Sequence, residues 1–135
     1  MSTTAFAHWP SELRSELDAL TANPRVGSRL LLEDEHTRIW EIRLGPGERI
    51  PFHRHVLDYV WVCVSGGTAI SRDGDGVIHD IRYAVGETRR LSFAAGESMI
   101  HDLENTGSDD LVFTTFEYLA SANAPLALPG DAPAP

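Results

Sequence analysis

The sequence predicts an all-β fold, either a sandwich or a barrel of short antiparallel strands. Between residues 29 and 119 it contains eight or more short segments that alternate apolar and polar residues or run apolar and β-branched. Turn residues separate these segments at close, regular spacing, which is typical of sandwiches and barrels. With 135 residues, the chain is long enough for one domain with one sizeable core and too short for two.

The residues ahead of this β region predict a short amphipathic helix. Ser11 is placed to cap it, and Pro24 lies just beyond its end. Its apolar stripe consists of Leu13, Leu17 and Leu20. We expect the stripe to pack against the outside of a sheet or against a second subunit. Residues 1–26 are therefore predicted to form an N-terminal arm, followed by a β domain at residues 27–119.

The β signal runs from the end of this arm to residue 119. The predicted strands are 29–33, 37–44, 59–64, 68–72, 77–84, 88–93, 98–104 and 111–119. In the second of these, Trp40, Ile42 and Leu44 share one face, so we expect them to point into the core. Gly66-Gly67 and the Asp-Gly-Asp-Gly run at residues 73–76 predict hairpin turns.

Charge and composition exclude several classes of partner. The formal net charge is −9, which argues against nucleic acid because phosphate binding needs a positive face. The same charge argues against an anionic membrane surface. No apolar run approaches the length of a membrane span, and residues 1–10 do not resemble a signal peptide. Cys63 is the only cysteine, so no intrachain disulfide is possible, and we expect a cytoplasmic protein.

The last segment, residues 120–135, predicts a flexible tail. It is rich in alanine and proline and carries one charge, Asp131. Proline at this density resists regular structure, so we expect the tail to be mobile or draped over a neighbour.

Two histidines two residues apart point to a metal site. They stand in the stretch 47–66, which begins at a Pro-Gly turn and runs into an apolar, β-branched strand. On a strand, residues i and i+2 face the same side, so His53 and His55 aim their rings into one space with Cβ atoms about 7 Å apart. Two imidazoles can close that distance onto one ion. The alternative is a surface strand that carries two histidines by chance.

A second histidine-bearing stretch, residues 93–107, completes a resemblance to the cupin superfamily. The first cupin motif has the spacing Gly-x5-His-x-His-x3-(Glu)-x6-Gly. The residues that fit it without a shift are Gly47, His53, His55 and Gly66. Gly96 followed by His101-x3-Asn105 resembles the second motif. The resemblance covers roughly residues 27–119 and implies a small single-domain cupin, an antiparallel jelly-roll β-barrel with a metal at its open end.

The chain departs from the motifs at two places. Tyr59 stands where the family usually has its glutamate ligand, and strand parity points it inward with the histidines. It is interpreted as a phenolate ligand, as a hydrogen-bond donor to substrate or bound oxygen, or as a pocket wall. In the second motif an alanine replaces the usual proline, and the gap from Gly96 to His101 is two residues longer. The His101-x3-Asn105 spacing still holds, so His101 is kept as a ligand.

The resemblance implies a metal set of His53, His55 and His101 with open positions for water and substrate. Such a set suits one divalent ion: Fe, Zn, Ni, Mn or Cu. Three neutral ligands leave a positive metal centre, which favours a small anionic substrate. The pattern is similar to the three-histidine cupins, among which are iron dioxygenases that cleave diketones or oxidise thiols. Fe(II) is therefore favoured.

The leading functional hypothesis is a non-heme iron dioxygenase acting on a small anionic organic molecule. The first alternative is a non-redox metal-dependent lyase or isomerase, in which Tyr59 or Glu117 moves a proton. The second is a binding module that holds a metal or small ligand without turnover. Cupins commonly dimerise, so the resemblance also implies a homodimer.

Other charged residues within the strands are weaker candidates. Glu117, near the end of the last strand, is the one retained as a general base. His79 falls on the apolar side of its predicted strand and is expected to be a structural histidine. Asp102 follows a predicted ligand but points the other way by alternation, so any part it plays at the metal is through its neighbours.

Overall fold

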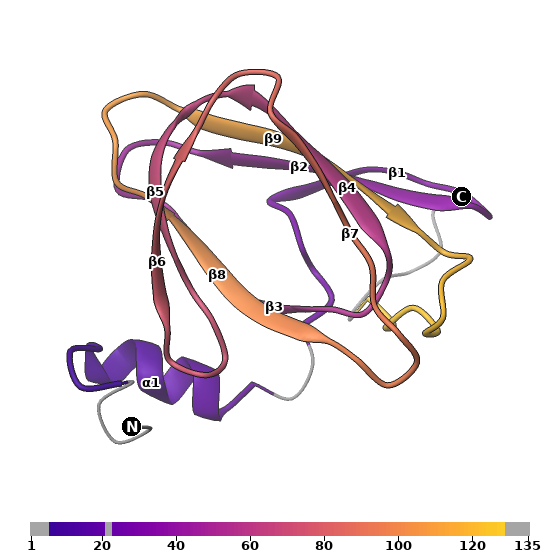
Figure 1. Ribbon diagram of the computed structural model, residues 1–135, viewed down its shortest axis with the longest axis horizontal. Helices are drawn as coiled ribbons and strands as arrows, with labels where there is room; N and C mark the ends of the chain where they lie inside the picture. Colours follow the sequence, from indigo (N-terminus) through magenta and orange to yellow (C-terminus); the bar gives the residue numbers. More distant parts are fainter. Residues whose placement is uncertain (1–5, 21–22, 129–135) are drawn as a thin grey trace.

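The structure, a computed structural model, describes residues 6–20 and 23–128 (Figure 1). Within these residues, nine strands form two antiparallel sheets around one interior, with one helix beside them. The helix is α1 (Ser11–Asp18). The strands are β1 (Arg29–Glu33), β2 (Thr37–Leu44), β3 (Arg49–His55), β4 (Tyr59–Ser65), β5 (Gly67–Arg72), β6 (Ile78–Tyr83), β7 (Thr88–Leu91), β8 (Met99–Asn105) and β9 (Leu111–Tyr118). The all-β prediction is confirmed.

The two sheets are the two walls of a jelly-roll barrel. One has the strand order β1-β2-β9-β4-β7 and the other the order β3-β8-β5-β6. Figure 1 shows the two walls facing each other across a common interior, with α1 beside the four-stranded wall. Since the chain passes repeatedly from one sheet to the other, side chains from both walls meet in a single core.

The core follows from the alternation of each strand. In β2, the inward residues Trp40, Ile42 and Leu44 are 0–9% exposed, as their period-2 pattern predicts. Ile42 and Leu44 pack with Phe113 of the same sheet and with Leu103 of the opposite sheet. Each fully buried side chain of this size contributes about 1.5–3 kcal/mol to folding. This packing fixes the barrel wall on which the histidines stand.

The Gly66-Gly67 link is a corner, and the prediction of a hairpin turn there is wrong. β4 belongs to the five-stranded sheet and β5 to the four-stranded sheet, so the chain changes walls at this point. A Cβ on Gly66 would overlap the carbonyl oxygen of Tyr83, which explains the need for glycine. The second predicted hairpin, at residues 73–76, is confirmed by the antiparallel pairing of β5 with β6.

A β-bulge in β3 re-aims the strand that carries the histidine pair. The register of β3 against β8 shifts between Ile50 and His53, and both residues face the interior although they are three apart. Pro51 lies in the bulge and has no N–H for the ladder. Phe52 therefore turns to the outer face, where the ring of Trp9 stacks on it with centroids 5.7 Å apart.

Helix α1 begins at Ser11, the residue predicted to cap it. Pro10 is the N-cap, and the Ser11 hydroxyl donates to the neighbouring Glu12 carboxylate instead of capping the helix. The predicted leucine stripe is only half-buried, and the closest link to the barrel is polar, from Glu16 to β3. In the described part of the chain, no helix is long and apolar enough to cross a membrane.

Residues 120–128, the described part of the predicted tail, return along the barrel. Asn123 Nδ2 donates to the carbonyl oxygen of Val56 at 3.0 Å, and the Leu126 carbonyl accepts from Arg38 at 2.9 Å. Leu128 packs in a small cluster with Trp40. The rest of the predicted flexible tail, 129–135, lies outside the described residues, as do 1–5 and 21–22 of the predicted arm.

Candidate metal centre

Three histidines converge inside the barrel from two neighbouring strands. β3 carries His53 and His55, β8 carries His101, and the ladder makes His53 and His101 direct partners. The ring centroids are 4.7 Å apart for His53–His101 and 5.0 Å for each of the other two pairs. One ring nitrogen from each histidine lies within 4.8 Å of the other two. Among the described residues, this is the one group of three or more metal-ligating side chains with such spacing.

The ring nitrogens are arranged as a metal site requires. His53 Nδ1 lies 2.8 Å from the Pro51 carbonyl oxygen, so it donates its proton there and leaves Nε2 free as a ligand. His55 Nε2 and His101 Nε2 are 3.1 Å apart. Two nitrogens each about 2.1 Å from one ion and about 90–110° apart would be separated by about 3.0–3.4 Å. The donor set therefore fits a shared divalent ion.

Burial keeps all three imidazoles neutral. Loss of hydration lowers the pKa of His53 to about 4, against the opposing hydrogen bond to Pro51. Burial and the neighbouring imidazoles hold the pKa values of His55 and His101 well below the ordinary range. Neutral imidazole is the form that binds metal, so the cluster needs no proton release at neutral pH.

The histidines lie at the junction of a small cavity and a wide groove. The inner cavity, which all three histidines line, measures about 60 Å³, room for roughly two water-sized groups. The outer groove is open and measures about 840 Å³. The residues that line both are Tyr59, Trp61, Ser71, Tyr83 and His101. A ligand with a small head can therefore reach the histidines while its remainder occupies the groove.

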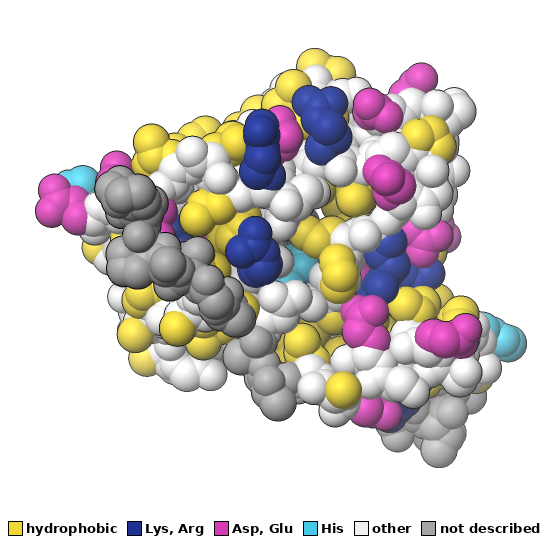
Figure 2. Space-filling view, turned by 180° about the vertical axis from the view of Figure 1, so that it is seen from behind, with side chains coloured by type: hydrophobic (Ala, Val, Ile, Leu, Met, Phe, Trp, Pro, Cys, Tyr) yellow, Lys and Arg dark blue, Asp and Glu magenta, His cyan; other side chains and the backbone are white. Residues whose placement is uncertain are grey.

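The rim of the groove is predominantly acidic. Its charged lining residues are Asp73, Asp75, Asp80, Glu87 and Arg89, and His79 lies among them. On the face shown in Figure 2, arginine, acidic and hydrophobic side chains are interspersed, and a histidine is visible in a hollow near the centre. His79 is interpreted from the sequence as a structural histidine on the apolar side of its strand. In the structure it shares the groove-lining side of β6 with Ile81 and Tyr83 and stands half-exposed at the rim, with its Nε2 3.0 Å from Asp73 Oδ2.

Tyr59 is part of the histidine site. Strand parity predicts that it points inward, and the structure stacks its ring on His55 with centroids 4.1 Å apart and planes 12° apart. The side chain is 3% exposed and lines both the cavity and the groove. Burial raises the pKa of its phenol above the ordinary value, so the group keeps its proton at neutral pH.

Glu117 is as buried in the barrel wall as Tyr59, each 3% exposed. It is directly opposite Tyr59 in the β4–β9 ladder, and its Oε1 accepts a hydrogen bond from Trp40 Nε1 at 2.7 Å. It is not among the described residues that line the inner cavity. Burial raises the pKa of the carboxyl group to about 7, although Trp40 and Arg38 act in the opposite direction. Of the two predicted catalytic residues, the structure brings only Tyr59 beside the histidines.

The Glu117→Gln variant is expected to be more stable than the wild type above pH 7 and equally stable near pH 4.5. The unfolded chain loses this proton near pH 4.5, while the folded chain retains it to about pH 7, so the folded state of the wild type is increasingly disfavoured across that interval. The full difference in the free energy of unfolding is about 3 kcal/mol. Urea unfolding of both proteins at pH 5 and pH 8 measures it. A difference that stays constant with pH would contradict the raised pKa.

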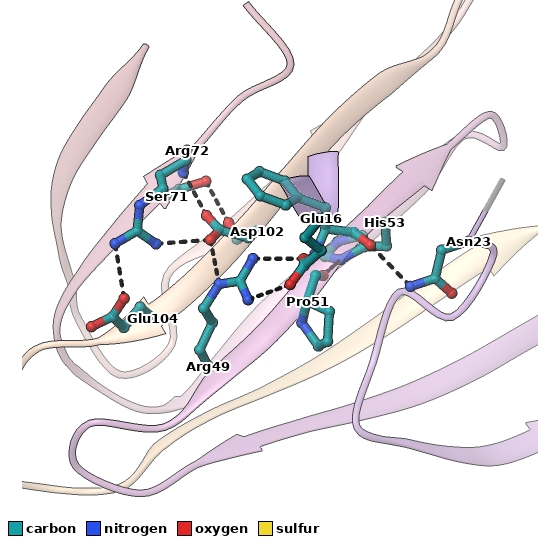
Figure 3. A network of polar contacts seen from close by, with 10 residues as sticks. Glu16, Asn23, Arg49, Pro51, His53, Ser71, Arg72, Asp102 and Glu104 are labelled. Carbon is teal, nitrogen blue, oxygen red and sulfur yellow. Dashed lines mark hydrogen bonds and ion pairs between the residues drawn. The ribbon is translucent and has the colours of Figure 1, made fainter. Parts of the chain in front are cut away.

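Behind the histidines, on the outer face of the four-stranded sheet, is a network of charged side chains (Figure 3). Its centre is Asp102, which is 0% exposed and follows His101 in β8. Asp102 accepts from Arg49 Nε at 2.6 Å, from Arg72 Nη1 at 2.8 Å and from the Arg72 backbone N–H at 2.7 Å. Arg72 also pairs with Glu104, and Arg49 makes a bidentate pair with Glu16 of α1 at 2.9 and 2.7 Å.

This network contains the residues that sequence analysis missed. Alternation predicts correctly that Asp102 points away from the metal site, but not that it is fully buried. The signal for Arg49 and Arg72 is weak, since each is simply a charge at a strand end. Arg49 and Asp102 are 53 residues apart, so only the pairing of β3 with β8 reveals the contact.

Comparison with solved structures gives the fold independent support. The chain is similar to a cupin domain from Bordetella pertussis Tohama I, with 20% identity and a TM-score of 0.59 over 74% of this chain and 98% of that one. It is similar to an uncharacterised conserved protein with a double-stranded β-helix domain from Klebsiella pneumoniae, with 19% identity and a TM-score of 0.55 over 79% and 90%. It is also similar to an RmlC-like cupin family protein from Methanocaldococcus jannaschii, with 23% identity and a TM-score of 0.54 over 67% and 76%.

Sequence comparison alone gives no match: no protein-family model matches the chain, and no curated protein matches it significantly. The likeness is therefore one of structure. The structure has the features that the sequence resemblance implies. These are two facing antiparallel sheets, a motif glycine at the Gly66 corner and three inward histidines on β3 and β8. The chain has the cupin fold, a double-stranded β-helix with a cluster of three histidines suited to a divalent metal ion.

Proposed function

We propose that this chain is a metal-dependent enzyme that acts on a small organic molecule at the three-histidine site. The observation that carries the proposal is the convergence of His53, His55 and His101, buried and neutral, at the inner end of an open groove. A histidine cluster that only stabilised the fold would not need an open groove leading to it. The three histidines would hold one divalent ion, with iron(II) favoured and Zn, Ni, Mn or Cu as the other candidates.

A bound iron(II) ion would supply oxygen-activating redox chemistry, and the leading proposal is a dioxygenase. The residues around it bind and orient the substrate. The protonated phenol of Tyr59 can donate a hydrogen bond to an oxygen of the substrate. Trp61 and Tyr83 line the junction between the cavity and the groove with aromatic surface. Glu117, opposite Tyr59, is proposed to hold a proton near neutral pH behind that side chain without touching the substrate.

The two compartments restrict the substrate that we propose. An anionic group suits the inner cavity, where three neutral ligands leave the charge of a divalent ion uncompensated. The cavity of about 60 Å³ admits only a small head such as a carboxylate or an enolate. The acidic rim disfavours a second negative group in the groove, since like charges repel there. A substrate with one anionic head and a neutral or cationic remainder fits both.

The metal and its chemistry are tested together. Protein purified without a histidine tag and without added metal is analysed for its elements, and oxygen uptake is then followed with diketones, thiols and phenolic acids. Near-stoichiometric iron with substrate-dependent oxygen uptake is the expected result. Zinc, nickel or manganese without oxygen uptake would favour a lyase or isomerase instead. Failure to bind any divalent metal, even after reconstitution, would overturn the proposal. The predicted homodimer and cytoplasmic location stay predictions.

A further inference from the structure

The bulge at Pro51-Phe52 is held in place by side chains from the N-terminal arm. The Phe52 backbone N–H donates to Glu16 Oε2 at 2.9 Å. The Asn23 side chain, labelled in Figure 3, donates from Nδ2 to the Phe52 carbonyl oxygen at 2.9 Å. The Arg54 backbone N–H donates to the Asn23 carbonyl at 2.8 Å. Both backbone hydrogen-bonding groups of Phe52 therefore find their partners in the arm.

This bulge decides how His53 faces the site. It allows Ile50 and His53 to share the inner face, and its carbonyl at Pro51 accepts the Nδ1 proton of His53. Rotation of the peptide unit at Pro51-Phe52 would move that carbonyl and release the ring. The orientation and tautomer of His53 therefore depend on bonds that Phe52 makes to residues outside the barrel.

Glu16 also connects the arm to the second histidine strand. Its carboxylate holds Arg49, and this hydrogen bond lowers the pKa of Glu16. Arg49 in turn binds Asp102, the residue after His101 in β8. One side chain of α1 thus contacts the bulge before His53 and, through Arg49, the backbone neighbour of His101.

We infer that the N-terminal arm, through Glu16 and Asn23, is the positioning element that holds His53 ready to bind metal. The inference rests on the proposed three-histidine metal site and adds a regulatory handle to it. Any partner or modification that pulls α1 from β3 would weaken metal binding without touching a ligand. Groups that position metal ligands typically change metal affinity 10–100-fold when removed.

The test compares Glu16→Ala and Asn23→Ala with a control on the same helix. Asp18→Ala removes one carboxylate from α1, as Glu16→Ala does, but breaks only the exposed Arg14–Asp18 pair and keeps Arg14 over the Phe6 ring. Zinc and cobalt(II) affinities are measured by competition with a chelator, and the cobalt(II) absorption spectrum reports the ligand geometry. We expect each of the first two variants to bind about tenfold more weakly or worse, with an altered cobalt spectrum. Asp18→Ala is expected to behave as wild type.

A second readout needs no metal. Nitrogen-15 spectra of the histidine rings in the metal-free protein report whether His53 carries its proton on Nδ1 and how fast that proton exchanges. The wild type is expected to show a protected Nδ1 proton, and Glu16→Ala and Asn23→Ala to lose that protection. Wild-type affinity and spectra in both variants would overturn the inference, as would an equal loss in Asp18→Ala. If the wild type binds no metal, the proposed function fails and the ring spectra alone decide this inference.

Discussion

The His53→Ala variant is expected to lose stoichiometric binding of a divalent metal while the barrel stays folded. His53 is one of only three nitrogens within reach of a shared ion in the described residues, and its free Nε2 is fixed by the bond to Pro51. Loss of a direct ligand should weaken affinity by at least about a hundredfold, the upper end for groups that merely support a ligand. Elemental analysis after dialysis and chelator competition measure the change.

The controls separate the site from general metal binding by histidine. His36→Ala removes a solvent-exposed imidazole, 80% exposed at the turn before β2, and should leave metal content unchanged. His101→Ala should behave like His53→Ala. The main core cluster contains none of these histidines, so circular dichroism should show the β fold in every variant. Retention of one metal per chain in both His53→Ala and His101→Ala would disprove the three-histidine assignment.

The Asp102→Ala variant is expected to lose about 3 kcal/mol in free energy of unfolding. That loss is a large fraction of the total free energy of unfolding of a typical domain. Asp102 is fully buried and accepts three hydrogen bonds. Its removal leaves Arg49 and Arg72 partly buried without their shared carboxylate, and leaves the Arg72 N–H without an acceptor. The value lies at the low end for broken buried ion pairs because Glu16 and Glu104 still hold the two guanidinium groups. Urea unfolding measures the free energy.

A matched variant of the same network gives the control. Glu104 accepts from Arg72 at 2.9 Å, but its side chain is 30% exposed, so Glu104→Ala should cost no more than about 1 kcal/mol. The two variants each remove one carboxylate from the same face of β8, at positions two residues apart. Equal losses would show that burial of Asp102 has no special effect and would contradict the expected result.

Local sequence patterns were enough to predict every strand except β3, where they indicate an extended segment only around the histidine pair. β2 runs from Thr37 to Leu44, as its alternation predicts, and β5 differs from the prediction by one residue at its start. The reason is that a period of two over a half-buried surface is visible within the strand itself. The same parity correctly turns Tyr59 and both histidines of β3 inward. The strand at residues 98–104 was predicted in the same way, but the role of His101 as a ligand was implied only by the spacing of its motif.

Features that depend on distant contacts were not predictable. Glycines at residues 66 and 67 suit a hairpin or a corner equally well, and only the sheet order distinguishes them. The apolar side of β6 suggested a structural role for His79, but its contact with Asp73 and its place at the groove rim depend on how the hairpin sits in the barrel. The hold of Glu16 on Phe52 joins residues 36 apart, and neither residue shows it in its local sequence.

The charged network behind the histidines also sets how the protein responds to ionic strength. Exposure rises from 0% at the Asp102 side chain to 19% at Arg49 and 34% at Glu16. Salt shortens the screening length from about 8 Å at physiological concentration to about 3 Å at 1 M, and it acts on exposed pairs far more than on buried ones. Added salt therefore loosens the Arg49–Glu16 end first and leaves the Asp102–Arg72 pair intact. The contacts of Glu16 with Arg49 and with the bulge before His53 are therefore more sensitive to salt than the buried part of the network. The His53 side chain itself is buried.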